Sequence, residues 1–284
     1  MRIAIASGKG GTGKTTVATN LAWVASQNDR QVAYLDCDVE EPNGHIFLKP
    51  EIAHRKPVET FIPRVDPDRC TVCGQCGQLC RYSAIIPIGS KVLVYPELCH
   101  ACGGCSLVCP AEAISEVPRE LGMLETGRAG PIDFAQGLLH IGQPMSPPVI
   151  KAVKSTYQEA DLTIIDAPPG TSCPVIEAVR ETDFVILVTE PTPFGLHDLK
   201  LAVEMVRVLK LPMGVVINRA DVGNLDTRDF CRARRIPILC EIPDDRRLAE
   251  AYSRGVMACE ALPEFRTMFE ELLKTACAME GVSG

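Results

Sequence analysis

Short apolar runs alternate with segments of helical spacing along most of the chain. Near the N-terminus, apolar side chains at Val17, Leu21 and Val24 recur at helical intervals between two apolar runs. The strands that we expect lie at residues 2–7, 31–35, 162–165, 184–189, 214–217 and 236–242, and the helices at residues 14–27, 174–181, 196–209, 226–234 and 262–279. This alternation predicts an α/β fold, a mostly parallel sheet with helices on both faces.

The pattern breaks between residues 62 and 118, where short apolar runs and turns surround eight cysteines. This segment contains an internal repeat, because the run from Cys70 to Cys80 matches the run from Cys99 to Cys109 at an offset of 29. A repeat that interrupts an alternation of strands and helices indicates an inserted module. The predicted domains are an α/β domain of residues 1–61 and 119–284 and an inserted α+β module of residues 62–118.

Composition and charge exclude some classes of partner. The chain has 284 residues, 46% of them hydrophobic and 23% charged, as in ordinary soluble domains. Its net charge of -7 argues against nucleic acid as a partner, because phosphate binding favours a basic excess.

No window approaches the roughly 18 consecutive apolar residues of a membrane span. The first residues read as a strand rather than a signal peptide. The last helix carries more acidic than basic residues, which disfavours anionic lipid and favours packing against the sheet. We therefore expect a cytoplasmic protein without a nucleic-acid or membrane partner.

Cysteine is unusually abundant, with 14 residues in the chain. In a reducing cytosol this abundance favours metal ligation over disulfides. Two runs share the spacing C-x₂-C-x₂-C-x₃-C; they are Cys70, Cys73, Cys76 and Cys80, and Cys99, Cys102, Cys105 and Cys109. Paired Cys-x₂-Cys also suits zinc, but a tetrahedral zinc site leaves the third and fourth cysteines of each run unexplained.

Both runs resemble those of bacterial two-cluster ferredoxins, in which three thiolates of one run and the fourth of the other hold each [4Fe–4S] cluster. The resemblance implies one cluster on Cys70, Cys73, Cys76 and Cys109, and a second on Cys99, Cys102, Cys105 and Cys80. Arg81 stands where the motif has proline, which removes no ligand. His100 lies between ligands and is expected to be an exposed neighbour rather than a ligand.

A glycine-rich loop follows the first strand and fits the phosphate-binding pattern G-x-x-x-x-G-K-[ST]. It consists of Gly8, Lys9, Gly10, Gly11, Thr12, Gly13, Lys14 and Thr15. Glycines let successive backbone N–H groups surround phosphate oxygens, and the following helix adds the positive end of its dipole. Lys14 is expected to reach the β- and γ-phosphates and Thr15 to bind Mg²⁺. The alternative is a glycine-rich turn without a ligand. Residues 121–148, rich in glycine and proline, are expected to form a mobile loop beside the nucleotide.

The segment from Lys9 to Thr16 resembles the deviant Walker A motif of the MinD/ParA/Mrp and nitrogenase-iron-protein superfamily of P-loop ATPases. The resemblance implies that Lys9 crosses a homodimer interface to touch the partner's nucleotide. It also places Asp38, in the second-strand motif, where the family positions the attacking water. Asp166, in the segment Ile-Ile-Asp-Ala-Pro-Pro-Gly, matches the Walker B aspartate near Mg²⁺.

Two further segments match the places where this family contacts adenine. They contain Asn218 in the first segment and Pro243 and Asp244 in the second. Because ligands bind at the carboxyl ends of parallel strands, these segments are expected to meet at the phosphate loop. The implied protein is an ATPase that forms a homodimer on ATP binding.

The two motifs together support three hypotheses. The first is an ATP-hydrolysing protein that couples nucleotide state to electron transfer through two [4Fe–4S] clusters, with an unknown redox partner. The second is a cluster carrier or assembly ATPase with a client protein, although Cys231, Cys240, Cys259 and Cys277 lack the C-terminal Cys-x₂-Cys of such carriers. The third is a non-enzymatic redox-sensing switch. Cys173, seven residues after Asp166, has the offset of a cluster-ligating cysteine in nitrogenase iron protein, but no second such cysteine lies between residues 121 and 143. We therefore expect Cys173 to be a buried structural cysteine.

Overall fold

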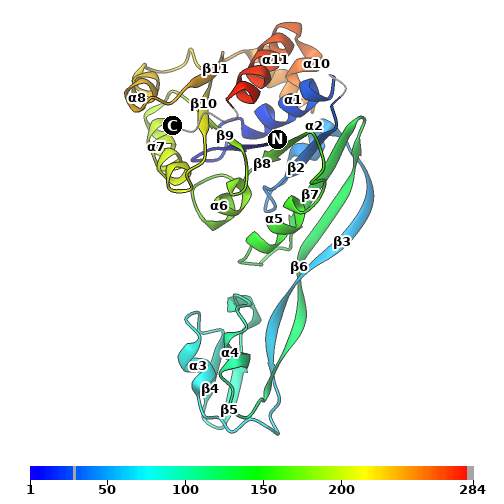
Figure 1. The fold of residues 1–284 in the computed structure, drawn as a ribbon, viewed down its shortest axis with the longest axis vertical. Coiled ribbons are helices and arrows are strands. Elements are labelled where there is room, and N and C mark those ends of the chain that lie inside the picture. The colour runs from blue at the N-terminus through cyan, green and yellow to red at the C-terminus, as the bar shows by residue number, and fades with distance from the viewer. Residues whose placement is uncertain (28–29, 280–284) are drawn as a thin grey trace.

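The computed structural model describes residues 1–27 and 30–279, which form one large sheet with helices on both faces and a smaller module held apart from it (Figure 1). The sheet strands are β1 (Arg2–Ala6), β2 (Val32–Asp36), β3 (Glu51–Val65), β6 (Ile114–Ala129), β7 (Ile132–Leu139), β8 (Leu162–Asp166), β9 (Phe184–Thr189), β10 (Met213–Asn218) and β11 (Ile238–Ile242). Their spatial order is β11-β10-β9-β1-β8-β2-β7-β6-β3.

The strands from β11 to β7 run parallel to one another, as the alternation of the sequence predicts. The central strands β1, β2, β8 and β9 are buried along almost their whole length. A strand covered on both faces must be apolar on both, which explains their continuous apolar runs. The prediction of a mostly parallel α/β sheet is confirmed.

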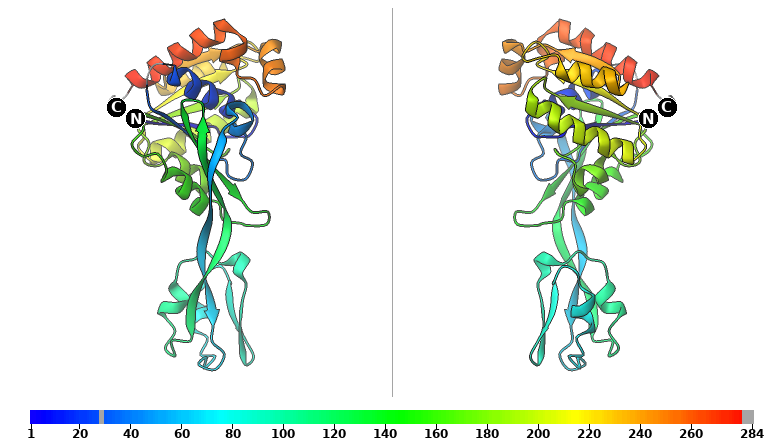
Figure 2. Two further views of the ribbon diagram at one scale, coloured as in Figure 1. Left: turned by 90° about the vertical axis from the view of Figure 1, so that its right-hand side faces the viewer. Right: turned by 90° about the vertical axis from the view of Figure 1, so that its left-hand side faces the viewer.

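Helices cover the two faces of the sheet as separate layers (Figure 2). One face packs against α1 (Lys14–Ser26), α2 (Gly44–Leu48), α10 (Ala258–Ala261) and α11 (Pro263–Ala278). The other packs against α5 (Pro147–Lys154), α6 (Cys173–Val179), α7 (Pro193–Val208) and α8 (Asp226–Arg234). As expected, α11 turns the apolar side chains Phe265, Phe269 and Leu272 into the core. None of the helices within the described residues is long and apolar enough to span a bilayer.

The strands β3 and β6 form a long antiparallel ribbon, paired from Glu51 and Arg128 at one end to Val65 and Ile114 at the other. Only part of β6 also pairs with β7, so the rest of the ribbon leaves the sheet (Figure 1). Our expectation of a mobile loop over residues 121–148 is wrong, because most of that segment lies in β6, β7 and α5. Gly122 and Gly127 face neighbouring backbone so closely that a side chain would collide with it. These glycines therefore allow neighbouring strands to pack closely, and they do not mark a loop.

The far end of the ribbon carries the cysteine module, by which we mean residues 66–113. It contains α3 (Gln75–Leu79), the hairpin of β4 (Ile85–Ile88) and β5 (Lys91–Val94), a 3₁₀ turn (Pro96–Leu98) and α4 (Gly104–Leu107). In Figures 1 and 2 the ribbon holds this module well away from the large sheet. The boundaries proposed from the sequence, at 62 and 118, lie inside β3 and β6. The ribbon is therefore a continuous part of both the sheet and the module.

Candidate functional site

The phosphate loop joins the buried end of β1 to the first residue of α1, where the sequence places it. Gly11 and Gly13 have φ angles of 76° and 95°, a region in which only glycine is comfortable. Gly8 packs against the backbone of α7 at Asp198, with no room for a side chain. The helix N-terminus thus opens onto the loop, with Lys14 buried at its first position. This geometry suits an anion.

A cavity of about 460 Å³ lies beside this loop at the carboxyl ends of the strands. Its lining includes most of the nucleotide-site residues expected from the sequence: Gly10, Gly11, Gly13, Lys14, Thr15, Thr16, Asp38, Asn218, Pro243 and Asp244. Four of that predicted set, Gly8, Lys9, Thr12 and Asp166, stand outside the lining.

Other residues of the same cavity were not among those predicted from the sequence. These are Glu41, Asn43, Pro169, Arg219, Asp245, Leu248, Ala249 and Tyr252. The last three lie on α9 (Arg246–Ser253), whose N-terminus is capped by the Asp245 side chain accepting from the Arg247 N–H. Asp245 directly after a predicted base-contact segment is the signal that could have revealed this helix start.

Three carboxyl groups meet behind the loop. Asp36 and Asp166 are the last residues of β2 and β8 and occupy paired positions. Asp36 accepts hydrogen bonds from the N–H groups of Asp38 (3.2 Å) and Gly44 (2.8 Å). Burial and the neighbouring Asp166 charge raise the pKa of Asp36 well above its usual range. Burial also raises the pKa of Asp38 to about 7, although the nearby Lys14 lowers it.

Asp166 is almost completely buried, and burial raises its pKa while Lys14 and the hydroxyls of Thr15 and Tyr34 oppose the change. Its Oδ1 atom is buried and has no hydrogen-bond partner among the described residues. A buried carboxylate oxygen without a partner is costly unless a cation or donor satisfies it. Together with the Thr15 hydroxyl, it provides the hard oxygen ligands that Mg²⁺ prefers, so the residues present fit this ion.

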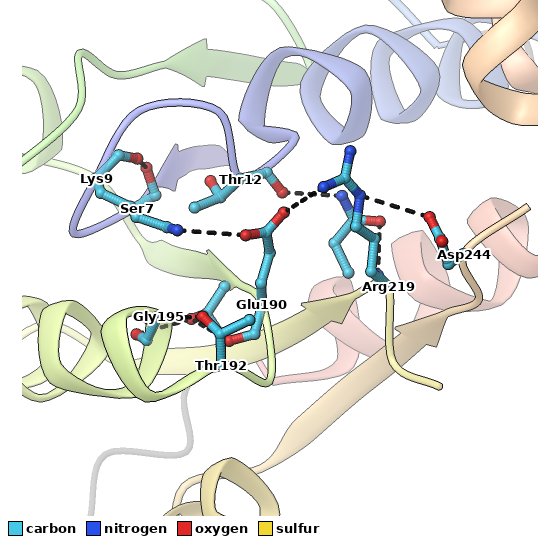
Figure 3. Close-up of polar contacts among 10 residues, drawn as sticks. Ser7, Lys9, Thr12, Glu190, Thr192, Gly195, Arg219 and Asp244 are labelled. Atoms are coloured by element: carbon cyan, nitrogen blue, oxygen red, sulfur yellow. Dashed lines mark hydrogen bonds and ion pairs between the residues drawn. The ribbon is translucent and has the colours of Figure 1, made fainter. Parts of the chain in front are cut away.

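Lys9 takes part in an ion-pair network around Glu190, the residue directly after β9 (Figure 3). Lys9 Nζ lies 3.3 Å from Glu190 Oε2, and the Arg219 guanidinium lies 3.2 Å from Glu190 Oε1. Arg219 Nε is also 3.5 Å from Asp244 Oδ1. Glu190 could not be predicted from the sequence, because a single glutamate after a strand belongs to no motif.

Asn218, expected from the resemblance to contact adenine, holds the phosphate loop in this structure. Its Nδ2 donates to the carbonyl oxygen of Thr12 at 2.9 Å, and its Oδ1 accepts from the Arg219 N–H at 3.0 Å. The side chain of Asn218 also leaves no room for a Cβ at Gly13. The amide therefore connects the end of β10 to the start of α1, on the wall of the cavity.

The cysteine module brings its two runs together around two cavities. One is lined by Cys70, Cys73, Cys76 and Cys109, and the other, of about 100 Å³, by Cys80, Cys99, Cys102 and Cys105. Each set takes three thiols from one run and the last from the other, which is the grouping implied by the ferredoxin resemblance.

Backbone N–H groups point at several of these sulfur atoms. The N–H groups of Ala84, Ala101 and Ala113 donate to the Sγ atoms of Cys80 (3.3 Å), Cys99 (3.4 Å) and Cys109 (3.3 Å). Within the described ranges, no three His, Cys, Asp or Glu side chains converge closely enough to hold a single metal ion. The thiols line two small cavities, and thiols in this grouping, with N–H groups aimed at sulfur, are the donor set that [4Fe–4S] clusters require.

The sequence also predicted the exposure of two further side chains, His100 and Cys173. His100 is exposed, as expected, and its ring stacks on that of Tyr82 at a centroid distance of 3.4 Å. Our expectation that Cys173 is buried is wrong, because it is exposed at the first position of α6. Cys37, Cys231 and Cys259 are buried, and burial raises the pKa of each thiol. Such thiols are poor nucleophiles and ligands.

A phosphate loop between a parallel strand and a helix, with acidic residues at the ends of the adjacent strands, defines a P-loop nucleotide-binding protein. The model of the CobQ/CobB/MinD/ParA nucleotide binding domain matches residues 3–258. The chain belongs to this family.

Relatives and solved structures agree with this assignment. An "Uncharacterized protein" of Methanocaldococcus jannaschii is 30% identical, covering 96% of this chain and 95% of its own length. An "Iron-sulfur cluster carrier protein" of the same organism is 23% identical over 96% of this chain and 84% of its own. The septum site-determining protein MinD of Pyrococcus horikoshii, solved with Mg-ADP, superposes with a TM-score of 0.59 at 21% identity, covering 100% and 98% of the two chains. That structural likeness shows the shared fold.

Proposed function

We propose that this protein binds and hydrolyses ATP and couples its nucleotide state to electron transfer through two [4Fe–4S] clusters. One observation carries the proposal: thiols of both cysteine runs surround two cavities at the end of a ribbon that is continuous with the nucleotide-binding sheet. A redox module joined by two paired strands is positioned more firmly than one on a single flexible linker.

The nucleotide chemistry follows from charge and position. Lys14, buried at the first turn of α1, faces the β- and γ-phosphates and offsets the charge that develops during phosphoryl transfer. Thr15 and Asp166 Oδ1 would hold Mg²⁺, whose charge would offset that of the phosphates. Asp38, on the cavity wall, orients the attacking water. Its pKa of about 7 in the nucleotide-free protein makes it a suitable proton acceptor at neutral pH.

The grouping of the cysteines favours clusters that stay in place. Because each cavity draws thiols from both runs, each cluster would be held by two separate segments of the chain rather than by one loop. Cys76 is also buried, and N–H groups donate to Cys80, Cys99 and Cys109. Hydrogen bonds to sulfur tune reduction potential, as expected of a site that transfers electrons. We therefore place electron transfer before cluster carriage.

Redox titration of anaerobically purified protein tests this function. We expect about eight iron and eight sulfide per chain, and midpoint potentials that change when a non-hydrolysable ATP analogue is added. Protein with zinc and no sulfide would contradict the assignment of the clusters. Midpoints that are identical with and without the analogue would contradict coupled electron transfer.

Cluster carriage is the second candidate, supported by relatives named iron-sulfur cluster carrier proteins, which are 23–26% identical to this chain. In that function, the protein would pass a cluster to an apo acceptor, and ATP would control release. Loss of iron from the protein with matching gain by an added apo-ferredoxin, faster than loss to a chelator, would favour carriage. Retention of iron under the same conditions would favour electron transfer.

A further inference from the structure

Tyr34 is a completely buried tyrosine on the central strand β2, and its hydroxyl donates to Asp166 Oδ2 at 3.1 Å. Asp166 is the aspartate whose other oxygen, Oδ1, has no partner among the described residues. The two oxygens of one carboxylate thus have different roles. The protein satisfies Oδ2, and it leaves Oδ1 available to a ligand.

The tyrosine ring is held on several sides. It stacks on Phe134 of β7, with a centroid distance of 5.8 Å and an interplanar angle of 11°. At the start of α2, Gly44 approaches the hydroxyl and ring so closely that a Cβ would collide with them. The Gly44 N–H in turn donates to Asp36 Oδ2. A hydroxyl held this way loses little conformational freedom when it donates, so it can fix the rotamer of its acceptor.

The electrostatics explain why such a donor is needed. Asp36 and Asp166 occupy paired positions at the ends of adjacent strands, and both are buried. Two buried carboxylates repel each other, and burial disfavours the charge on each. The hydrogen bond from Tyr34 to Oδ2 fixes the orientation of the Asp166 carboxylate beside Asp36. An oriented carboxylate oxygen is what a divalent cation requires.

We propose that Tyr34 is a positioning residue for the magnesium site, holding Asp166 Oδ2 so that Oδ1 is presented beside Thr15. The inference rests on the proposed Mg²⁺-dependent nucleotide binding and adds a residue from the core to it. A phenylalanine at this position would pack equally well, so the role assigned to Tyr34 depends on its hydroxyl group.

The test uses Tyr34→Phe in the full chain, with Tyr157→Phe as the matched control. Tyr157 also donates its hydroxyl, to the carbonyl oxygen of Gly127 at 3.2 Å, but belongs to the core on the other face of the sheet. The probe is fluorescently labelled ADP, titrated with Mg²⁺ or in EDTA. For Tyr34→Phe we expect the Mg²⁺ concentration at half-effect to rise at least tenfold, because the carboxylate loses the hydrogen bond that fixes its orientation. Affinity in EDTA should stay within about twofold of wild type.

Two results from folded Tyr34→Phe would overturn the inference: an unchanged Mg²⁺ requirement, or an equal loss of affinity with and without Mg²⁺. If this variant does not fold, Gly44→Ala decides, because its added methyl group pushes on the same hydroxyl and should reproduce the Mg²⁺ defect. Normal Mg²⁺ dependence in folded Gly44→Ala would equally overturn the inference. A wild-type protein that binds ADP equally with and without Mg²⁺ would contradict the proposed magnesium site itself, and the inference with it.

Discussion

The ammonium group of Lys9 lies 3.3 Å from the carboxylate of Glu190 within one chain. The Glu190 side chain is only 11% exposed and also pairs with Arg219. The family resemblance implies that Lys9 reaches across a dimer interface to the partner's nucleotide. For Lys9 to do so, the pair with Glu190 must break. The ion-pair network in Figure 3 would therefore stabilise the monomer and oppose dimerisation.

Weakening this ion pair should promote dimerisation. Glu190→Gln removes the charge that holds Lys9, so we expect ATP-dependent dimers at about fivefold lower protein concentration, the equivalent of ~1 kcal/mol. Sedimentation with a non-hydrolysable ATP analogue measures the effect. Lys9→Ala should abolish dimer-dependent hydrolysis. Glu204→Gln is the control, because Glu204 pairs with Arg207 and Arg234 on the surface. Equal dimerisation of Glu190→Gln and the control would argue against an opposing ion pair.

Lys14 and Asp38 should separate binding from hydrolysis. Lys14→Ala removes a buried charge from the first turn of α1 and should weaken nucleotide affinity more than tenfold. Asp38→Asn keeps the shape of the cavity wall but cannot orient or deprotonate water. We expect affinity within about threefold of wild type and at least a hundredfold loss of turnover. Calorimetry and phosphate release measure the two quantities. Normal turnover in Asp38→Asn would show that another group orients the water.

Asp38 should also make the stability of the nucleotide-free protein depend on pH. Burial raises its pKa from 3.8 to about 7 in the folded state. Between these values, the folded protein holds a proton that the unfolded chain has lost. This contribution to stability is therefore complete below about pH 4 and declines as the pH rises through 7. Asp38→Asn should lose less thermal stability than wild type between pH 5 and 8, whereas Asp229→Asn on the exposed face of α8 should follow wild type. Parallel curves for all three proteins would refute the shifted pKa.

The two cysteine sets should be separable by mutation. Cys102→Ser removes one thiol from the cavity that also contains Cys80, Cys99 and Cys105. We expect loss of about four iron per chain while nucleotide affinity remains unchanged. Cys173→Ser is the matched control, because Cys173 is exposed but lies outside both cavities. Iron loss from Cys173→Ser would instead indicate a further site at α6. Full iron content in Cys102→Ser would contradict the proposed ligand sets.

A row of polar side chains crosses the sheet from the nucleotide site toward the ribbon. Asp36 is paired in register with Gln136, Gln136 with Glu125, and Glu125 with Arg55. Gln136 Nε2 donates to Glu125 at 2.6 Å, and Arg55 Nε donates to the other oxygen of Glu125 at 2.7 Å. Asp36 begins the row on the strand that leads to Asp38, and Arg55 ends it on β3. Hydrogen bonds join the side chains of this row on β7, β6 and β3, and the register places Asp36 beside Gln136. The row is therefore a candidate route from the nucleotide site to the near end of the ribbon.

Nucleotide binding should therefore change the cluster potentials. By linkage, a tenfold difference in ATP affinity between redox states equals about 60 mV for a one-electron couple. We expect a shift of at least this size in wild type and a smaller one in Glu125→Gln. Asp133→Asn is the control, because Asp133 on β7 pairs with Arg128 on β6, and neither residue belongs to the row. Equal shifts in all three proteins would exclude the row as the connection.

The sequence determined those features that depend on neighbouring residues. Apolar periodicity predicted the central strands and the helices around them, and the spacing of the glycines predicted the phosphate loop. The grouping of the thiols followed from the resemblance of the two cysteine runs to those of ferredoxins. These signals are local, because backbone geometry couples residues only a few positions apart. The tertiary structure decided what depends on distant segments: the pairing of Glu190 with Lys9, the contact of Tyr34 with Asp166, and the polar row across β2, β7, β6 and β3. It also decided that Gly122 and Gly127 lie in a strand, because their close backbone neighbours come from β7 and β3. Such contacts exist only once the sheet has formed, and they leave no periodic trace in the chain.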